Sequence, residues 1–162
     1  MHSHKALVVD DDRATLKFMK QVLELRHYSV QTFDNPTLVP PFRCGSCPCS
    51  LRDTGCPDII ISDFNMPVMK GDELLTSRID KGCRCRHLAL ITGTQLSEPE
   101  LLKLADYGIR YFKKPLELSE FFTWLNQIEA VSADFRRDRL TAALPPQIKF
   151  TPPIVFTFSG AT

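Results

Sequence analysis

The sequence predicts an α/β fold with a doubly wound, five-stranded parallel sheet that carries helices on both faces. Five short apolar runs recur along the chain, and helix-like segments separate most of them. The chain has 162 residues, of which 43% are hydrophobic, enough for one domain with a buried core. Strands that alternate with helices form a parallel sheet covered on both sides. Right-handed crossovers then bring the carboxyl ends of the strands to one edge.

The first part of the chain predicts a strand, a helix and a second strand. The apolar run Ala6–Val9 ends in three acidic residues, Asp10 to Asp12. From Arg13 to Arg26, apolar residues recur at helical spacing, and Asp12 is a good N-cap for that helix. Ser29–Phe33 alternates as a second strand does.

The segment 34–57 breaks this pattern. It holds prolines at 36, 40, 41, 48 and 57 and cysteines at 44, 47, 49 and 56. Prolines at this density prevent a long helix. We therefore expect a Cys/Pro-rich insert where a helix would otherwise lie.

The remainder of the chain returns to alternating elements. Ser97 is expected to cap the second of its helices, with acids in the first turn as the helix dipole prefers. The predicted elements are the strand Ile59–Ser62, the helix Asp72–Asp80, the strand Leu88–Ile91, a helix that begins at Glu98 and is stopped by Gly108, the strand Ile109–Phe112 and a final helix from Leu118 to about Phe135.

Polar residues follow four of these strands. The carboxyl edge of the sheet is expected to carry Asp10, Asp11, Asp63, Thr92 and Lys114. Open parallel sheets bind ligands at this edge. Three carboxylates there would repel one another unless a cation or a base lay among them.

These residues form motifs that resemble a response-regulator receiver domain of two-component signalling, over residues 5–136. The motifs are Val8-Val9-Asp10-Asp11, Asp63-Phe64-Asn65-Met66-Pro67, Gly71, Ile91-Thr92-Gly93 and Lys114-Pro115. The resemblance implies a flavodoxin-like strand order of 2-1-3-4-5.

The resemblance assigns the central role to Asp63, which matches the residue that a sensor histidine kinase phosphorylates. A carboxylate can attack phosphorus and form an acyl phosphate. Asp11 and Asp63 match the carboxylates that hold Mg²⁺, with a backbone carbonyl at Asn65 and with Asp10 acting through water. A hard cation with few protein ligands and several waters suits that set.

Three further residues match the family pattern. Lys114 matches the lysine that pairs with phosphoryl oxygens, and its bond to Pro115 is usually cis in the family. Thr92 matches the hydroxyl that bonds the phosphorylated state. Tyr111 matches the aromatic switch position, although a half-exposed strand tyrosine is an equally ordinary interpretation.

The expected function is a conformational switch that acts on a downstream protein. We expect no enzyme in the usual sense, only Mg²⁺-assisted self-phosphorylation and autodephosphorylation. A net charge of +1 gives no case for nucleic-acid binding, no apolar run would span a membrane, and no signal peptide precedes the first strand. We therefore expect a cytoplasmic, stand-alone receiver, because too little chain follows the last helix for an output domain.

The cysteines are Cys44, Cys47, Cys49, Cys56, Cys83 and Cys85. If the fold is as expected, they can cluster at the amino end of the sheet. Bound Zn²⁺, an iron–sulfur cluster, a disulfide and free thiols all remain open. An alternative function follows, a receiver-like interaction module that senses metal or redox state through these cysteines without phosphorylation.

The carboxyl-terminal tail, residues 138–162, is rich in proline and ends in an apolar, β-prone stretch. Such a segment pairs readily with a sheet edge or with another chain. We expect a receiver domain over residues 1–137, and a tail that docks on this domain or on a second copy, giving a homodimer.

Overall fold

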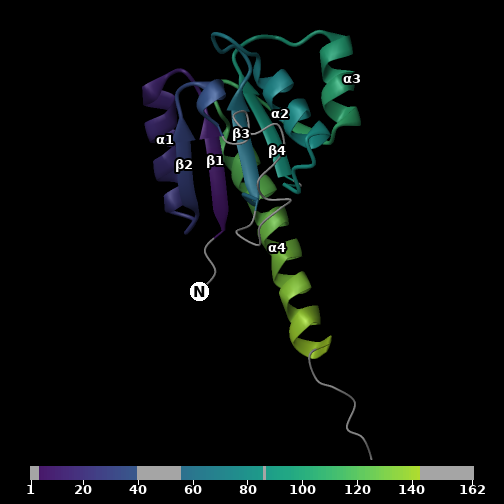
Figure 1. The fold of residues 1–162 in the computed structure, drawn as a ribbon. Coiled ribbons are helices and arrows are strands. Elements are labelled where there is room, and N and C mark those ends of the chain that lie inside the picture. The colour runs from purple at the N-terminus through teal and green to yellow at the C-terminus, as the bar shows by residue number, and fades with distance from the viewer. Residues whose placement is uncertain (1–3, 40–55, 86, 143–162) are drawn as a thin grey trace, which may run out of the picture. The chain divides into compact units, whose positions relative to one another are not determined.

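The computed structural model describes residues 4–39, 56–85 and 87–142, with the backbone alone for 132–142 (Figure 1). Its elements are β1 (Lys5–Val9), α1 (Arg13–Glu24), β2 (Ser29–Phe33), the 3₁₀ helix η1 (Pro36–Leu38), β3 (Ile59–Asp63), α2 (Gly71–Asp80), β4 (His87–Thr92), α3 (Glu98–Asp106), β5 (Ile109–Lys113) and α4 (Leu118–Ala142). The strands form one parallel sheet in the order β2-β1-β3-β4-β5. The predicted fold class and strand order are confirmed.

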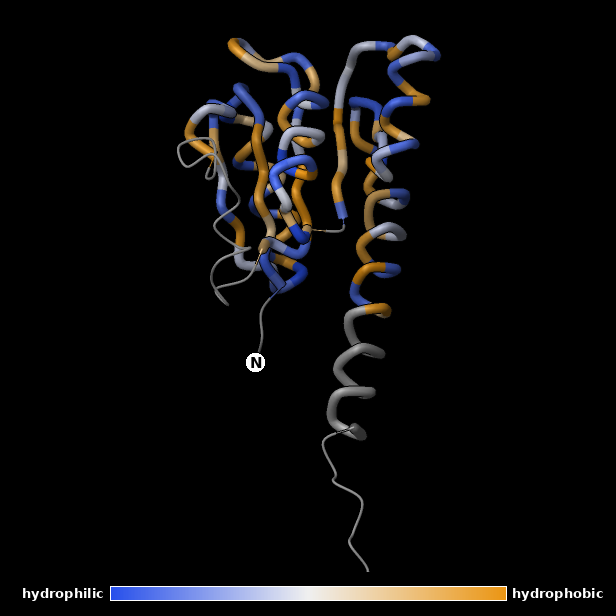
Figure 2. Tube along the Cα trace, turned by 45° about the vertical axis from the view of Figure 1, so that its right-hand side comes forward, coloured by the Kyte–Doolittle hydropathy of each residue, from blue (hydrophilic) through white to orange (hydrophobic). Residues whose placement is uncertain are grey.

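The central strands are buried on both faces, as their apolar sequences require. All five residues of β3 are buried, and so are four of the five in β1. Figure 2 shows these strands largely in the hydrophobic colour, between helices banded in both colours. One apolar cluster joins alternate strand residues to α2 and α3, including Leu7, Ile60, Leu88, Leu74 and Leu104.

Side-chain contacts show which helices share a face of the sheet. The guanidinium of Arg26, just after α1, lies 5.7 Å from the ring of Phe122 in the first turns of α4. On α2 and α3, Lys103 Nζ lies 2.8 Å from Asp72 Oδ2. These contacts pair α1 with the first turns of α4, and α2 with α3, which agrees with the predicted fold class of a sheet with helices on both faces.

The chain divides into two compact units, residues 1–124 and residues 125–162. The first unit holds the whole sheet and every candidate site residue that the structure describes. Helix α4 begins in the first unit and continues into the second. Among the described residues, no helix has the length and apolar character that crossing a membrane would take.

Two predicted helix ends are wrong. Helix α1 stops at Glu24 rather than Arg26, because His27 adopts a left-handed conformation (φ 62°) and Tyr28 N–H bonds back to Leu23 O at 3.1 Å. Helix α4 continues past Phe135 to Ala142, since the sequence offers no glycine or proline there to end it. The predicted caps Asp12 and Ser97 are confirmed.

Most of the predicted insert, residues 40–55, and most of the tail, residues 143–162, lie outside the described residues. At the start of the insert, Asn35 Oδ1 accepts from Thr37 N and caps η1. Cys44, Cys47 and Cys49 also lie outside the described residues, so the Cys/Pro-rich insert remains a prediction. The domain boundary at residue 137 likewise remains a prediction.

Candidate phosphoacceptor site

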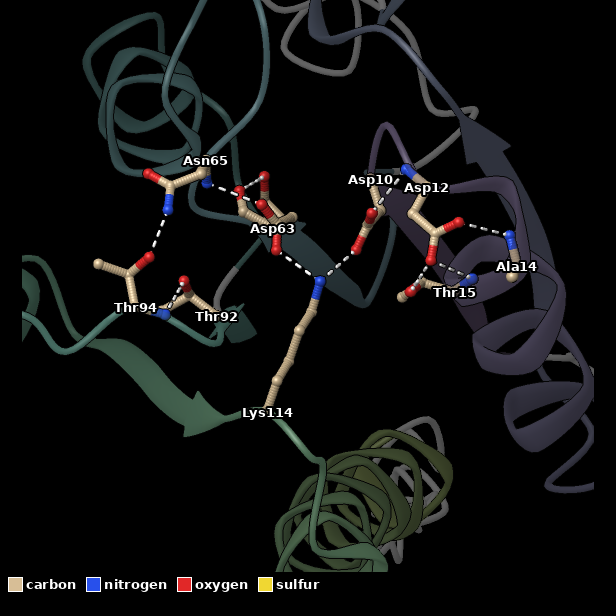
Figure 3. Close-up of polar contacts among 10 residues, drawn as sticks. Asp10, Asp12, Ala14, Thr15, Asp63, Asn65, Thr92, Thr94 and Lys114 are labelled. Carbon is tan, nitrogen blue, oxygen red and sulfur yellow. Dashed lines mark hydrogen bonds and ion pairs between the residues drawn. The ribbon is translucent and has the colours of Figure 1, made fainter.

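Four predicted site residues lie where strands of the sheet end. Asp10 follows β1, Asp63 and Thr92 are the last residues of β3 and β4, and Lys114 follows β5. The strand register aligns these ends, because Val9 pairs with Ser62 and Thr92 pairs with Lys113. The fold thus brings residues from four strands to one edge (Figure 3).

Lys114 joins the two buried carboxylates of the site. Its Nζ donates to Asp63 Oδ1 at 2.6 Å and to Asp10 Oδ2 at 2.9 Å. The other oxygen of Asp63, Oδ2, accepts from the Asn65 backbone N–H at 2.7 Å. Both oxygens of Asp63 are therefore held, and the orientation of the carboxylate is fixed. The Lys114–Pro115 peptide bond is cis.

Burial and charge act in opposite directions on these groups. Burial raises the pKa of Asp10, which is only 3% exposed, and this outweighs the hydrogen bonds from Lys114 and Asp12 that lower the pKa. Burial alone would lower the pKa of Lys114, but its hydrogen bonds to Asp63 and Asp10 raise the pKa above its ordinary value. The ammonium is thus held in its charged form between two carboxyl groups.

The structure separates Asp11 from this cluster. The Asp11 side chain is exposed, and the hydrogen bonds of Lys114 go to Asp10 and Asp63 instead. No three acidic, histidine or cysteine side chains gather as a metal-binding group among the described residues. Three carboxylates at one point would repel one another, whereas two share one ammonium.

The donor set still fits a magnesium ion. Mg²⁺ binds through one or two carboxylates and keeps several waters. Asp10 and Asp63 supply two such carboxylates, both already aimed at one cationic atom. Asp11 lies next to Asp10 and is open to solvent.

A second hydrogen-bonded chain lies beside Asp63. The Asn65 side-chain amide donates to Thr94 Oγ1, and Thr94 N–H donates to Thr92 Oγ1 at 3.1 Å. Sequence reasoning missed Thr94. The available signal was a second threonine two residues after Thr92, close to the same edge of the sheet. Thr92 is 1% exposed, whereas Tyr111, the predicted switch residue, is half-buried against the apolar cluster.

The described cysteines lie away from this edge, next to β3 and β4. Cys56, Cys83 and Cys85 are free thiols in the structure. They do not form a metal-binding group, so the described residues give no support to a zinc or iron–sulfur site. Burial raises the pKa of Cys85 to about 12.

A doubly wound parallel sheet with an acidic pair and a lysine at its carboxyl edge defines the receiver class of signalling domain. The family model of the response regulator receiver domain matches residues 6–126. The chain belongs to this family and is a receiver domain of two-component signalling. Receiver domains typically accept a phosphoryl group without being enzymes and bind Mg²⁺, and their place in two-component signalling implies a histidine kinase partner.

Individual proteins are similar to this chain in sequence or in fold. The chain is 28% identical over 135 residues to the nisin biosynthesis regulatory protein NisR of Lactococcus lactis subsp. lactis, covering 83% of this chain and 52% of NisR. It therefore spans about half the length of this curated relative. A signal receiver domain of an HD domain-containing protein from Pseudomonas fluorescens is similar in fold, with a TM-score of 0.63, 24% identity and coverage of 82% of this chain and 99% of that one. A receiver domain protein from Clostridium thermocellum is also similar in fold, with a TM-score of 0.63, 21% identity and coverage of 85% of this chain and 98% of that one.

Proposed function

We propose that Asp63 accepts a phosphoryl group from a sensor histidine kinase, and that the phosphorylated chain switches its affinity for a partner protein. The observation that carries the proposal is the pair of contacts from Lys114 Nζ to Asp63 and Asp10. An ammonium at this position lowers the repulsion between an anionic nucleophile and an anionic phosphoryl group.

In the proposed step, an oxygen of the Asp63 carboxylate attacks phosphorus. The new O–P bond forms as the bond between phosphorus and the donor breaks, and the electron pair of that bond leaves with the donor. The product is an acyl phosphate on Asp63. Lys114 holds Oδ1 and the Asn65 N–H holds Oδ2, so the carboxylate does not have to be oriented during the reaction.

Asp10, Asp11 and Asp63 are the residues that would hold Mg²⁺, together with the Asn65 carbonyl. The ion would supply further neutralisation of the phosphoryl oxygens. Asp10 retains its hydrogen bond to Asp12 N–H at 2.9 Å, which fixes its position at the strand end.

We propose Thr92 as the residue that senses the phosphoryl group, with Tyr111 following it. The Thr92 hydroxyl oxygen accepts from Thr94 N–H. That bond leaves the hydroxyl hydrogen to donate, and a phosphoryl oxygen is a strong acceptor. The bond from Asn65 to Thr94 links this loop to the loop after Asp63. Phosphorylation of Asp63 would therefore also act on the loop after β4 through this bond. Asn65 also lies on the proposed route of the water that removes the phosphoryl group.

The test is labelling by radioactive acetyl phosphate with Mg²⁺. We expect the unmodified chain to be labelled and the isosteric Asp63→Asn variant to lose at least nine-tenths of the label. Asp58→Asn is the matched control, because Asp58 lies just before the same strand at its other end and accepts from Lys5 N–H at 2.7 Å. Undiminished label in Asp63→Asn would overturn the proposal.

The alternative, a phosphorylation-independent module that senses metal or redox state through its cysteines, predicts a different result. Beryllofluoride binds only with an intact carboxylate and a divalent cation. We expect beryllofluoride and Mg²⁺ to bind in a coupled manner, and the alternative expects neither to affect binding of the other.

Other parts of the proposal concern the surroundings of the chain. They are a cytoplasmic location, a protein rather than a nucleic acid as the downstream partner, a receiver domain over residues 1–137, and a homodimer formed through the tail 138–162. Deleting residues 143–162 tests the last point by the mass measured in light scattering.

A further inference from the structure

Two thiols meet at the amino end of the sheet. Cys56 lies just before β3, and Cys83 lies after α2 in the loop that leads to β4. These strands are neighbours, with Ile59 opposite His87, so the two loops lie side by side. The Cys83 thiol donates to Cys56 Sγ at a sulfur–sulfur distance of 3.9 Å.

Both thiols are held in place and remain within reach of solvent. Each is half-buried and packs against the apolar cluster of β3 and β4. The Arg84 backbone N–H donates to Cys56 Sγ at 3.2 Å, which fixes that sulfur on the Cys83 side of the loop. A small oxidant can therefore reach either sulfur, and each sulfur has the other as its neighbour.

The third described cysteine is engaged elsewhere. Cys85 is 7% exposed, and its Sγ lies 3.5 Å from Asp58 O and 3.6 Å from His87 O. It thus faces the main-chain carbonyl just before β3 and the one at the start of β4, and not the solvent. Among the described residues, the arrangement singles out Cys56 and Cys83.

We propose that Cys56 and Cys83 are an oxidation site and form a reversible disulfide. The separation must shrink from 3.9 Å to about 2.05 Å. Both residues lie in loops, where rotation about the Cα–Cβ bonds can supply that movement. The disulfide would join the start of β3 to the loop before β4, at the end of the sheet opposite Asp63.

A peroxide is the oxidant class in the proposed reaction. One thiolate attacks a peroxide oxygen, the O–O bond breaks, and the thiol becomes a sulfenic acid while the other oxygen leaves as water or an alcohol. The second thiol then attacks the sulfenic sulfur, the S–S bond forms, and the hydroxyl leaves as water. Two thiols lose two electrons and two protons in total, and the peroxide accepts them. A dithiol reductant reverses the change.

Trypsin makes the test specific, because it separates the three described cysteines from one another and from the other three cysteines of the insert. Cys56 is released in peptide 53–70, Cys83 in 82–84 and Cys85 in 85–86, whereas Cys44, Cys47 and Cys49 share peptide 44–52. The folded chain is treated with hydrogen peroxide, remaining thiols are blocked, and the digest is read by mass spectrometry without reduction. We expect peptide 53–70 linked to 82–84 as the main cross-link, lost after dithiothreitol.

Variants and an unfolded control decide the outcome. Cys83→Ser and Cys56→Ser should each abolish the cross-link, while Cys85→Ala should retain it. In guanidinium, the same oxidant should favour pairs close in sequence, such as Cys83 with Cys85, and reduce the yield of the 56–83 link at least fivefold. The proposal would be overturned if Cys56 of the folded chain were linked mainly to peptide 44–52. It would also be overturned if the blocking reagent were found on all of Cys56 and all of Cys83. The readout does not involve phosphorylation, so failure here leaves the function of Asp63 unaffected.

Discussion

A Cβ atom added to Gly71 would lie 1.9 Å from the main-chain oxygen of Asp63 and 2.8 Å from Ser62 Oγ. The first residue of α2 thus rests directly against the backbone of Asp63. Gly71 N–H also donates to Phe64 O at 2.9 Å, which turns the chain back onto β3 after Asp63. The position of the carboxylate therefore depends on the absence of a side chain at residue 71.

We expect Gly71→Ala to lower the free energy of unfolding by about 2–4 kcal/mol, because a rigid main-chain atom must move to admit the methyl group. Urea unfolding at neutral pH measures this loss. The displaced backbone carries Asp63 with it, so labelling by acetyl phosphate should fall at least tenfold even where the variant remains folded. Stability equal to that of the unmodified chain would contradict the expectation.

Gly93→Ala is the matched control for this experiment. A Cβ on Gly93 would lie 3.8 Å from Lys114 Cβ, which is an ordinary contact. We expect its effect on unfolding to stay within about 0.5 kcal/mol.

Lys114→Met keeps most of the lysine stem and removes the ammonium between Asp10 and Asp63. We expect a loss of about 1–3 kcal/mol at pH 7, because a buried carboxylate loses its charged partner. Lys113→Met, one residue earlier and exposed, is the control and should change stability by less than about 0.5 kcal/mol.

The loss in Lys114→Met should shrink in acid. The raised pKa of Asp10 means that the folded state binds its proton more tightly than the unfolded state does. This group therefore favours folding at low pH, and the contribution is lost as pH rises through its folded pKa. Removing Lys114 raises this pKa further, so protonated Asp10 should restore part of the stability. A loss that is equal at pH 7 and pH 4 would argue against this account.

Asp12 should give the opposite dependence on pH. Thr15 Oγ1 donates to its carboxylate at 2.7 Å, and the Ala14 and Thr15 backbone N–H groups donate at 3.0 and 3.2 Å; these bonds lower its pKa. A lowered pKa means that its contribution is present above the unfolded pKa and is lost as pH falls through the folded pKa.

Asn at position 12 remains a good N-cap but does not titrate. Between about pH 5 and pH 2, we therefore expect the unmodified chain to lose more stability than Asp12→Asn does. Urea midpoints across this range measure the difference, and parallel curves for the two proteins would show that Asp12 contributes nothing to it.

Cys85 should resist alkylation in the folded chain. Its pKa of about 12 against an ordinary 9.0 leaves about a thousandfold less thiolate at pH 8, and the thiolate is the reactive form. Iodoacetamide at pH 8 should label Cys83 at least tenfold faster than Cys85. In guanidinium, the two rates should become similar. Equal labelling of the two cysteines in the folded chain would mean that Cys85 is not buried as described.

The sheet and the placement of the strand-end residues were predictable from local patterns. Each apolar run marks a strand, and the polar residue at its carboxyl end, as at Asp10, Asp63 and Thr92, marks to within one residue where the strand ends. Once the strands are parallel, topology brings these residues to one edge without further information. The position of Lys114 after β5 follows in the same way.

Long-range contacts were not predictable from such patterns. Lys114 contacts Asp10 and Asp63, whereas Asp11 stays exposed to solvent. This selection depends on burial and on the reach of the lysine side chain. The bond from Asn65 to Thr94 joins two loops that are 29 residues apart. The clash at Gly71 depends on how closely a helix approaches a strand, which sequence spacing does not encode.

β3 runs between the two proposed reaction sites, with Cys56 just before its first residue and Asp63 as its last. An extended chain advances about 3.3 Å per residue, so the seven steps from Cys56 to Asp63 span roughly 20 Å; the last five of these residues form the buried strand β3. The strand pairs with four residues of β1 on one side and with five residues of β4 on the other, so it has little freedom to bend. A disulfide at the amino end of β3 and a phosphoryl group at its carboxyl end would thus act on the same rigid strand. We expect the disulfide to change amide hydrogen exchange near Asp63, and phosphorylation of Asp63 to change exchange near Cys56.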